Sequence, residues 1–233
     1  MEVELVTVRH GETESNKSRI VQGHRDTALS ELGLKQAECV GKYLAETSFS
    51  LALSSDLIRA LKTGQVIAES NPSLSPDNIE TWTVLRERCF GEFEGQAWSK
   101  LTDTMKGLDK NQLLEWGPSG GETGQQFKDR ARSFLKDLGK RTIKIDDSSP
   151  VRVLVTSHGG FIKELNMVMV ADHKCEMPCD HGEYGRISPN TGVTKFLINL
   201  DKEGKITSAK CTLLYYKDHL EGLEFHEPLH YGL

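Results

Sequence analysis

The stretch Leu5-Val-Thr-Val-Arg9-His10-Gly11-Glu-Thr-Glu-Ser-Asn16 begins with apolar, β-branched residues and continues with polar ones. Its apolar part, residues 3–8, predicts a buried strand. The run stops at Arg9-His10-Gly11, so a cation and an imidazole are expected at the carboxyl end of the strand, where open α/β sheets bind ligands. Gly11 is expected to let the backbone turn sharply and approach that ligand closely. Since arginine grips two oxygens of an anion and histidine is a nucleophile, the stretch predicts a phosphoryl site.

A second stretch repeats this arrangement. Residues 151–156 form another β-branched run, which ends in Ser157-His158-Gly159-Gly160 and is followed by apolar residues at helical spacing. His158 is therefore expected at a helix N-terminus, where free N–H groups and the helix dipole favour an anion. Chance is a poor explanation for two predicted strands that each end in His-Gly.

Together these motifs resemble the signature of the histidine phosphatase superfamily, in its phosphoglycerate mutase-like branch. The resemblance covers nearly the whole chain in the order of the family. Its C-terminal part, residues 217–223, resembles the fructose-2,6-bisphosphatases of that family. The loop at 143–150 is much shorter than the insertion those enzymes have there. The matching segments are Arg9-His10-Gly11-Glu12, Asn16, Gln22-Gly23, Ser54 to Ala60, Leu85-Arg86-Glu87-Arg88, Gly120 to Thr123, Ser157-His158-Gly159 and Pro189 to Gly192.

The resemblance implies a role for each matching residue. His10 would accept the phosphoryl group and Glu87 would protonate the leaving oxygen, while Arg9, Arg59 and His158 would surround the phosphoryl oxygens. Substrate contacts are implied for four further residues, namely Asn16, Gln22, Gly23 and Gly159.

Some of these roles have competitors in the sequence. Arg59 is expected in the first turn of a helix, where a cation opposes the dipole unless an anion binds there. Glu92 and Glu94 are alternatives to Glu87 as the proton donor. A second phosphate on the substrate would need more cations, and the candidates are Arg19, Arg25, Arg86, Arg88, Lys100 and Lys163.

The alternation of strand and helix predicts an α/β fold, a three-layer sandwich with a mainly parallel central sheet. The resemblance adds a phosphoglycerate mutase-like topology: one domain over residues 1–233 with a cap-like excursion at about 85–142. The expected strands are 3–8, 51–53, 79–84, 151–156, 191–200 and 206–216. The expected helices are 30–47, one capped by Ser54-Ser55-Asp56, a polar one within 96–116, 123–142 and one after His158.

Composition limits the class of protein. The 233 residues are 37% hydrophobic and 27% charged, with a net charge of −5, which argues against disorder. No basic tract points to nucleic acid. No signal peptide and no apolar run of the ~20 residues a membrane span needs is present, and the five cysteines are odd in number and scattered, so a cytoplasmic protein with free thiols is expected.

No cofactor or metal is expected. The sequence has neither a P-loop nor a dinucleotide fingerprint. The residues His173, Cys175, Cys179 and His181 offer zinc-type ligands, but their spacing favours a polar loop over a metal site.

The sequence therefore predicts a metal-independent phosphoric monoester hydrolase that forms a phosphohistidine and acts on small phosphorylated metabolites. From the resemblance, fructose 2,6-bisphosphate is expected first and 2,3-bisphosphoglycerate second, with the effect of lowering glycolytic flux. Two alternatives stay open: a phosphoglycerate mutase, and a weakly active regulatory protein that binds partners. Oligomeric state and protein partners are not predicted.

Overall fold

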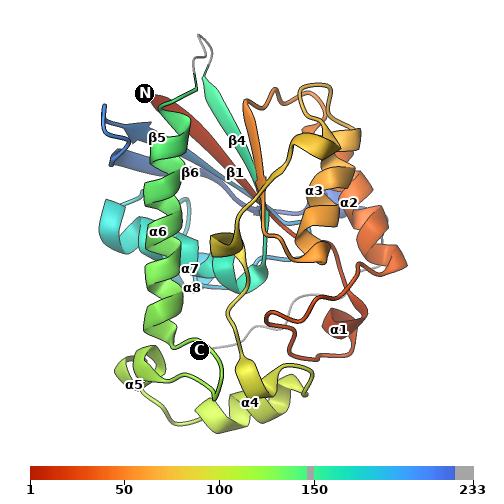
Figure 1. The fold of residues 1–233 in the computed structure, drawn as a ribbon, viewed down its shortest axis with the longest axis vertical. Helices are drawn as coiled ribbons and strands as arrows, with labels where there is room; N and C mark the ends of the chain where they lie inside the picture. Colours follow the sequence, from red (N-terminus) through yellow and green to blue (C-terminus); the bar gives the residue numbers. More distant parts are fainter. Residues whose placement is uncertain (146–149, 224–233) are drawn as a thin grey trace.

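The computed structural model describes residues 1–145 and 150–223 and has a six-stranded sheet in the order β3-β2-β4-β1-β5-β6 (Figure 1). The strands β1 (Glu2–Arg9), β2 (Leu51–Ser54), β3 (Glu80–Thr81) and β4 (Val151–Ser157) are mutually parallel. Two strands, β5 (Val193–Leu200) and β6 (Ile206–Tyr216), complete one edge in antiparallel pairing. The mainly parallel α/β sheet predicted from the sequence is confirmed.

Helices cover both faces of this sheet, as Figure 1 shows, because the β-branched strands are apolar on both sides. On β1, Val3 and Leu5 pack into a cluster with α6 (Gly124–Thr142) and α7 (Gly159–His173). The alternate residues Val6 and Val8 pack against α2 (Glu31–Leu44) and α3 (Ile58–Glu69). This three-layer arrangement aligns the carboxyl ends of β1, β2 and β4 at one edge of the sheet.

Side-chain caps mark the starts of α2 and α6. The Ser30 hydroxyl accepts a hydrogen bond from Gly33 N–H, and Thr123 forms a capping box with Gln126, as predicted. The predicted cap of α3 is wrong: Leu57 occupies the N-cap and no side chain of Ser54-Ser55-Asp56 caps the helix. Instead, Asp26 accepts a hydrogen bond of 2.7 Å from Ile58 N–H. A residue 32 positions earlier in the chain therefore caps α3.

Two other expected elements differ from the structure. Only Glu80–Thr81 of the strand expected at 79–84 pairs with β2; Trp82 N–H then bonds Ser54 O and the chain turns into the 3₁₀ helix η2 (Thr83–Leu85). The reason is that β2 itself ends at Ser54, which leaves nothing further to pair. The helix expected within 96–116 is divided into α4 (Trp98–Met105) and α5 (Lys110–Glu115) by Gly107, whose φ of +87° ends the first helix.

Segments between η2 and α6, together with Val21, form a small cluster of their own beyond the carboxyl ends of the strands. In Figure 1, α4 and α5 lie there, away from the sheet. The buried members of this cluster are Val21, Phe90, Phe93, Leu101 and Met105. By contrast, the buried face of α6 belongs to the main core. The remaining short elements are α1 (Glu14–Lys17), η1 (Pro76–Asn78), η3 (Gly91–Phe93), α8 (His181–Tyr184) and η4 (Asp218–Leu220).

Candidate active site

A cavity of about 710 Å³ opens at the carboxyl ends of β1 and β4, and His10 lies in its wall. The His10 side chain is 3% exposed, and its Nδ1 lies 2.6 Å from Gly11 O. Because a carbonyl oxygen only accepts hydrogen bonds, Nδ1 carries the proton and Nε2 keeps a free lone pair. Burial, and then the charges of Arg59 and Arg9, lower the pKa of His10 well below 6.5. The imidazole is thus a neutral nucleophile.

Gly11 has a different role from the one its sequence context suggests. It does not line the cavity, and a Cβ atom placed on it would lie 2.3 Å from Gly33 O. The close approach that Gly11 permits in this structure is therefore to the first turn of α2. This packing holds the loop that follows His10 against α2.

Two arginines face the cavity beside His10. Arg9 donates from Nη1 to Ser188 O at 2.7 Å, while Arg59 donates to Gly23 O and Arg25 O, each at 2.8 Å. Arg59 is 1% exposed, and burial lowers its pKa to about 10, so it remains charged at neutral pH. Its Nε has no hydrogen-bond partner within the described parts of the chain. A buried guanidinium with an unused donor is suited to bind an anion.

His158 lies behind His10, with the two ring centroids 5.3 Å apart. It is the N-cap residue of α7, is fully buried and is not among the residues that line the cavity. Its Nε2 is 2.8 Å from Ser55 Oγ, and its Nδ1 has no partner among the described residues. Burial, with the charge of Arg59, lowers its pKa well below 6.5. His158 is thus neutral and has one ring nitrogen available.

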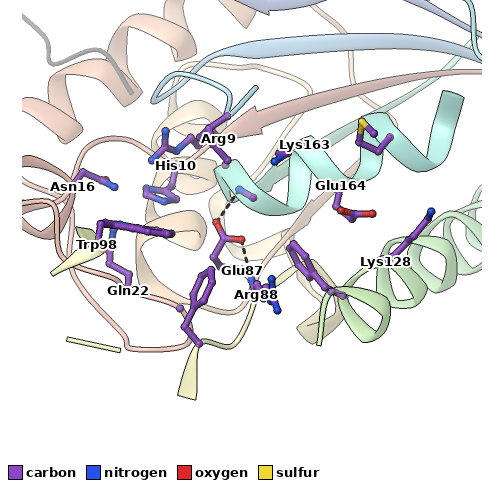
Figure 2. Close-up of a pocket in the computed structure, with 18 of the residues that line it drawn as sticks. Arg9, His10, Asn16, Gln22, Glu87, Arg88, Trp98, Lys128, Lys163 and Glu164 are labelled. Atoms are coloured by element: carbon purple, nitrogen blue, oxygen red, sulfur yellow. Dashed lines mark hydrogen bonds between the residues drawn. The ribbon is translucent and has the colours of Figure 1, made fainter. Parts of the chain in front are cut away.

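Glu87 crosses the cavity from the segment after η2 and reaches the N-terminus of α7. Its two carboxylate oxygens accept hydrogen bonds from Gly160 N–H and Arg88 N–H, each at 2.9 Å, as the dashed lines in Figure 2 show. Neither neighbouring arginine is its ion-pair partner: Arg86 binds Asp56 at 2.5 and 2.7 Å, and Arg88 donates to backbone carbonyls. The carboxylate is therefore held in the cavity by backbone groups.

The competing acids lie elsewhere. Glu94 accepts hydrogen bonds from His24 N–H and Phe90 N–H, and the exposed Glu92 accepts one from Ser119 N–H. Neither lines the cavity.

The four residues expected to bind substrate all line the cavity. The Asn16 carbonyl oxygen accepts from Thr13 N–H and lies 3.4 Å from Asn190 Nδ2, so its amide nitrogen is the group left to donate. The Gln22 carbonyl oxygen is likewise bound by the Thr13 and Thr27 hydroxyls. A Cβ atom on Gly159 would lie 3.1 Å from Arg9 Nε, so a glycine there gives the guanidinium room.

Only part of the expected set of second-phosphate cations reaches the cavity. Arg19, Arg88 and Lys163 line it, whereas Arg25, Arg86 and Lys100 do not. Arg86 is engaged by Asp56, as described above. Lys17, Lys110 and Lys128 also line the cavity and were not predicted. These lysines occur in polar helical segments, where lysine is the ordinary surface residue, so the sequence carries no signal for them.

Two positioning contacts were also missed. Asn190 donates to His10 O at 2.9 Å, and the Thr63 hydroxyl accepts from Gly11 N–H while it donates to Arg59 O. Asn190 belongs to the Pro-Asn-Thr-Gly motif, which was a usable signal. Thr63 is one polar residue among the mostly apolar buried residues of α3 and gave none.

The described residues include no group of three His, Cys, Asp or Glu side chains placed to hold a metal; the side chain of His181 lies outside them. All five cysteines have free thiols. Within the described residues, no helix is long and apolar enough to cross a membrane.

A buried neutral histidine at a strand end, flanked by two arginines and faced by a carboxylate, defines a phosphatase site on an α/β fold. Residues 5–208 match the model of the histidine phosphatase superfamily (branch 1), and the chain belongs to this family.

Relatives and solved structures agree with this assignment. The chain is 32% identical to the fructose-2,6-bisphosphatase TIGAR of Bos taurus, over 94% of this chain and 97% of that protein. A mycobacterial glucosyl-3-phosphoglycerate phosphatase in complex with VO3 superposes with a TM-score of 0.72 at 26% identity, covering 92% of this chain and 99% of that one. A phosphoglycerate mutase from Bacillus anthracis gives a TM-score of 0.70 at 25% identity, with 89% and 91% covered.

Proposed function

We propose that the protein is a metal-independent phosphatase that transfers the phosphoryl group of a small phosphorylated metabolite to His10 and then to water. The observation that supports this most is the hydrogen bond between His10 Nδ1 and Gly11 O. It directs the unprotonated Nε2 to the substrate side, and the lowered pKa of His10 keeps that nitrogen unprotonated at neutral pH.

In the first step, His10 Nε2 forms a bond to phosphorus as the bond from phosphorus to the ester oxygen breaks. Arg9 and Arg59 neutralise charge on the phosphoryl oxygens; Asn16 and, behind His10, the buried Nδ1 of His158 are neutral and stabilise these oxygens only as hydrogen-bond donors. Glu87, in its protonated form, gives a proton to the departing oxygen. In the second step, water attacks the phosphohistidine, Glu87 takes a proton from it, and inorganic phosphate leaves.

We propose fructose 2,6-bisphosphate as the first substrate and 2,3-bisphosphoglycerate as the second, which would make the protein a cytoplasmic brake on glycolysis. The support is the relationship to TIGAR and the presence of Arg19, Arg88 and Lys163 in the cavity wall. One or two charge-assisted contacts to a second phosphate contribute ~1.5–3 kcal/mol each, or about ten- to a hundredfold in preference over a monophosphate. The free thiols support the cytoplasmic location.

The deciding experiment is rapid acid quenching with a labelled bisphosphate. Wild-type protein should retain acid-labile phosphate, and His10→Ala should retain none while its circular dichroism spectrum is unchanged. Equal labelling of the variant would remove His10 from the mechanism.

Steady-state kinetics on a substrate panel separates the alternatives. Catalytic efficiency should be higher on the two bisphosphates than on fructose 6-phosphate, 3-phosphoglycerate or p-nitrophenyl phosphate. Isomerisation of 3-phosphoglycerate without net phosphate release would favour a mutase, the function of the Bacillus anthracis protein. Absence of turnover on every substrate would favour a regulatory binding protein.

A further inference from the structure

The cavity continues well past the phosphoryl site along one face of α7. Its lining residues on this helix follow a helical stripe from Gly159 and Gly160, through Lys163, Glu164 and Met167, to Ala171. At ~1.5 Å per residue the stripe is about 18 Å long. Figure 2 shows Glu164 on the side of Glu87 away from His10, with Lys128 beyond it. A hexose bisphosphate, whose two phosphates are attached to one small sugar, occupies only part of this length.

We call the part of the cavity beyond Glu87 the α7 extension; three helices form its walls. α5 contributes Leu113 and Leu114, and α6 contributes Phe127, which face the stripe of α7. The Arg130 guanidinium stacks 4.8 Å from the centroid of the Phe127 ring, which fixes the orientation of that ring. The apolar side chains of the α7 extension are Leu113, Leu114, Phe127, Met167 and Ala171.

The charged side chains of the α7 extension are of both signs. Glu164 places a half-buried carboxyl group in its wall, and burial raises the pKa of that group. Lys128 and Lys163, which also line the cavity, interact electrostatically with Glu164. Arg88 is occupied by the carbonyls of Glu122 and Trp116. Lys110 also lines the cavity, so the case for an uncharged occupant rests on the apolar side chains of the α7 extension.

We propose that the α7 extension binds an uncharged, largely apolar group on the alcohol side of the substrate, so that the enzyme also hydrolyses phosphate monoesters of extended apolar alcohols. This inference rests on the proposed phosphatase activity but not on fructose 2,6-bisphosphate as the substrate. Each methylene that moves from water into the α7 extension should improve binding about fourfold, by the usual transfer free energy.

Binding of unhydrolysable n-alkylphosphonates, measured by calorimetry, tests this inference without turnover. Octylphosphonate should bind wild-type protein at least ~100-fold more tightly than ethylphosphonate, since several methylenes are buried. Met167→Glu should bring this ratio close to one because it places a carboxylate among the apolar side chains. The matched control is Ser133→Glu, which adds the same charge at an exposed position of α6 outside the cavity and should keep the wild-type ratio.

Kinetics on the matching alkyl phosphates then separates this inference from the proposed function. The ratio of kcat/KM for octyl over ethyl phosphate should be high in wild type and in Ser133→Glu, and low in Met167→Glu. If wild type binds the two phosphonates equally, or if Met167→Glu keeps the wild-type ratio of octyl to ethyl affinity, the α7 extension does not bind an apolar group. Neither result would count against bisphosphate hydrolysis. Tight octylphosphonate binding without hydrolysis of any ester overturns the proposed function instead.

Discussion

The Ser55 hydroxyl lies 2.8 Å from Nε2 of His158 and connects the end of β2 to the end of β4 behind the nucleophile. Ser55 Oγ also accepts a hydrogen bond from Leu57 N–H, so the serine hydroxyl hydrogen is free to point at His158. In that arrangement the His158 proton is on Nδ1, the nitrogen without a partner among the described residues. Ser55 therefore engages Nε2 of His158 and leaves Nδ1 as the ring nitrogen available to a phosphoryl oxygen.

Ser55→Ala should lower kcat and destabilise the protein by about 1–3 kcal/mol, the cost of leaving a buried polar atom unpaired. Urea unfolding and steady-state kinetics measure the two effects. A double-mutant cycle with His158→Ala should show strong coupling, because both changes remove the same interaction. Additive losses would place the role of Ser55 outside this hydrogen bond.

Glu87→Gln should slow hydrolysis of alkyl phosphates by ~10²–10⁴-fold and affect p-nitrophenyl phosphate much less. The reason is that a stable departing oxygen needs little help from a proton donor. Measuring kcat/KM over a series of leaving groups gives the contrast. A uniform loss over the series would return Glu92 or Glu94 to consideration, or assign Glu87 a purely electrostatic role.

Gly160→Ala should reproduce part of the Glu87→Gln defect. A Cβ atom at residue 160 would lie 2.3 Å from Glu87 Oε1, so the carboxylate must move. The control is Gly182→Ala, whose Cβ meets no atom within 4 Å and should leave kinetics unchanged. If kcat/KM of Gly160→Ala depended on the leaving group as it does in wild type, the exact position of the Glu87 carboxylate would not matter for catalysis.

Stability should fall as the pH is lowered from about 6.5 towards 4, partly because of His219. Burial lowers the pKa of this histidine to about 4, and its Nε2 lies 3.1 Å from Thr191 Oγ1. Between its folded pKa and the unfolded value of about 6.5, the unfolded chain binds a proton that the folded chain does not. Acid therefore favours unfolding.

His219→Gln keeps a neutral hydrogen-bonding group and removes this titration. Its free energy of unfolding, from urea titrations at about pH 7 and about pH 5, should change less between the two pH values than that of wild type. The pKa values of His10 and His158 are also lowered, so the free energy of unfolding should still depend on pH in both proteins. Identical slopes would show that His219 titrates normally.

Prolonged dialysis against EDTA should leave phosphatase activity unchanged. The expected charge neutralisation comes from Arg9 and Arg59, which remain protonated at neutral pH. Loss of activity that one added metal restores would contradict this, and would direct attention to His173, Cys175, Cys179 and His181.

The sequence by itself determined what depends on neighbours along the chain. β-Branched runs gave the two central strands, and hydroxyl residues a few positions before an apolar stripe gave the caps at Ser30 and Thr123. The same local logic placed His10 at the end of β1 and His158 at the start of α7. These interactions span at most a few residues, so composition and spacing are enough to predict them.

Only the tertiary structure decided the contacts between segments far apart in the chain. The Asp26 cap of α3, the Ser55–His158 hydrogen bond and the Glu87–Gly160 contact join residues 32, 103 and 73 positions apart. Which polar side chain meets which partner depends on how the layers pack, and no periodicity of the sequence encodes it. Packing of the layers also decided which candidate cations line the cavity, namely Arg19, Arg88 and Lys163. It likewise decided that the cavity continues along α7 between apolar side chains.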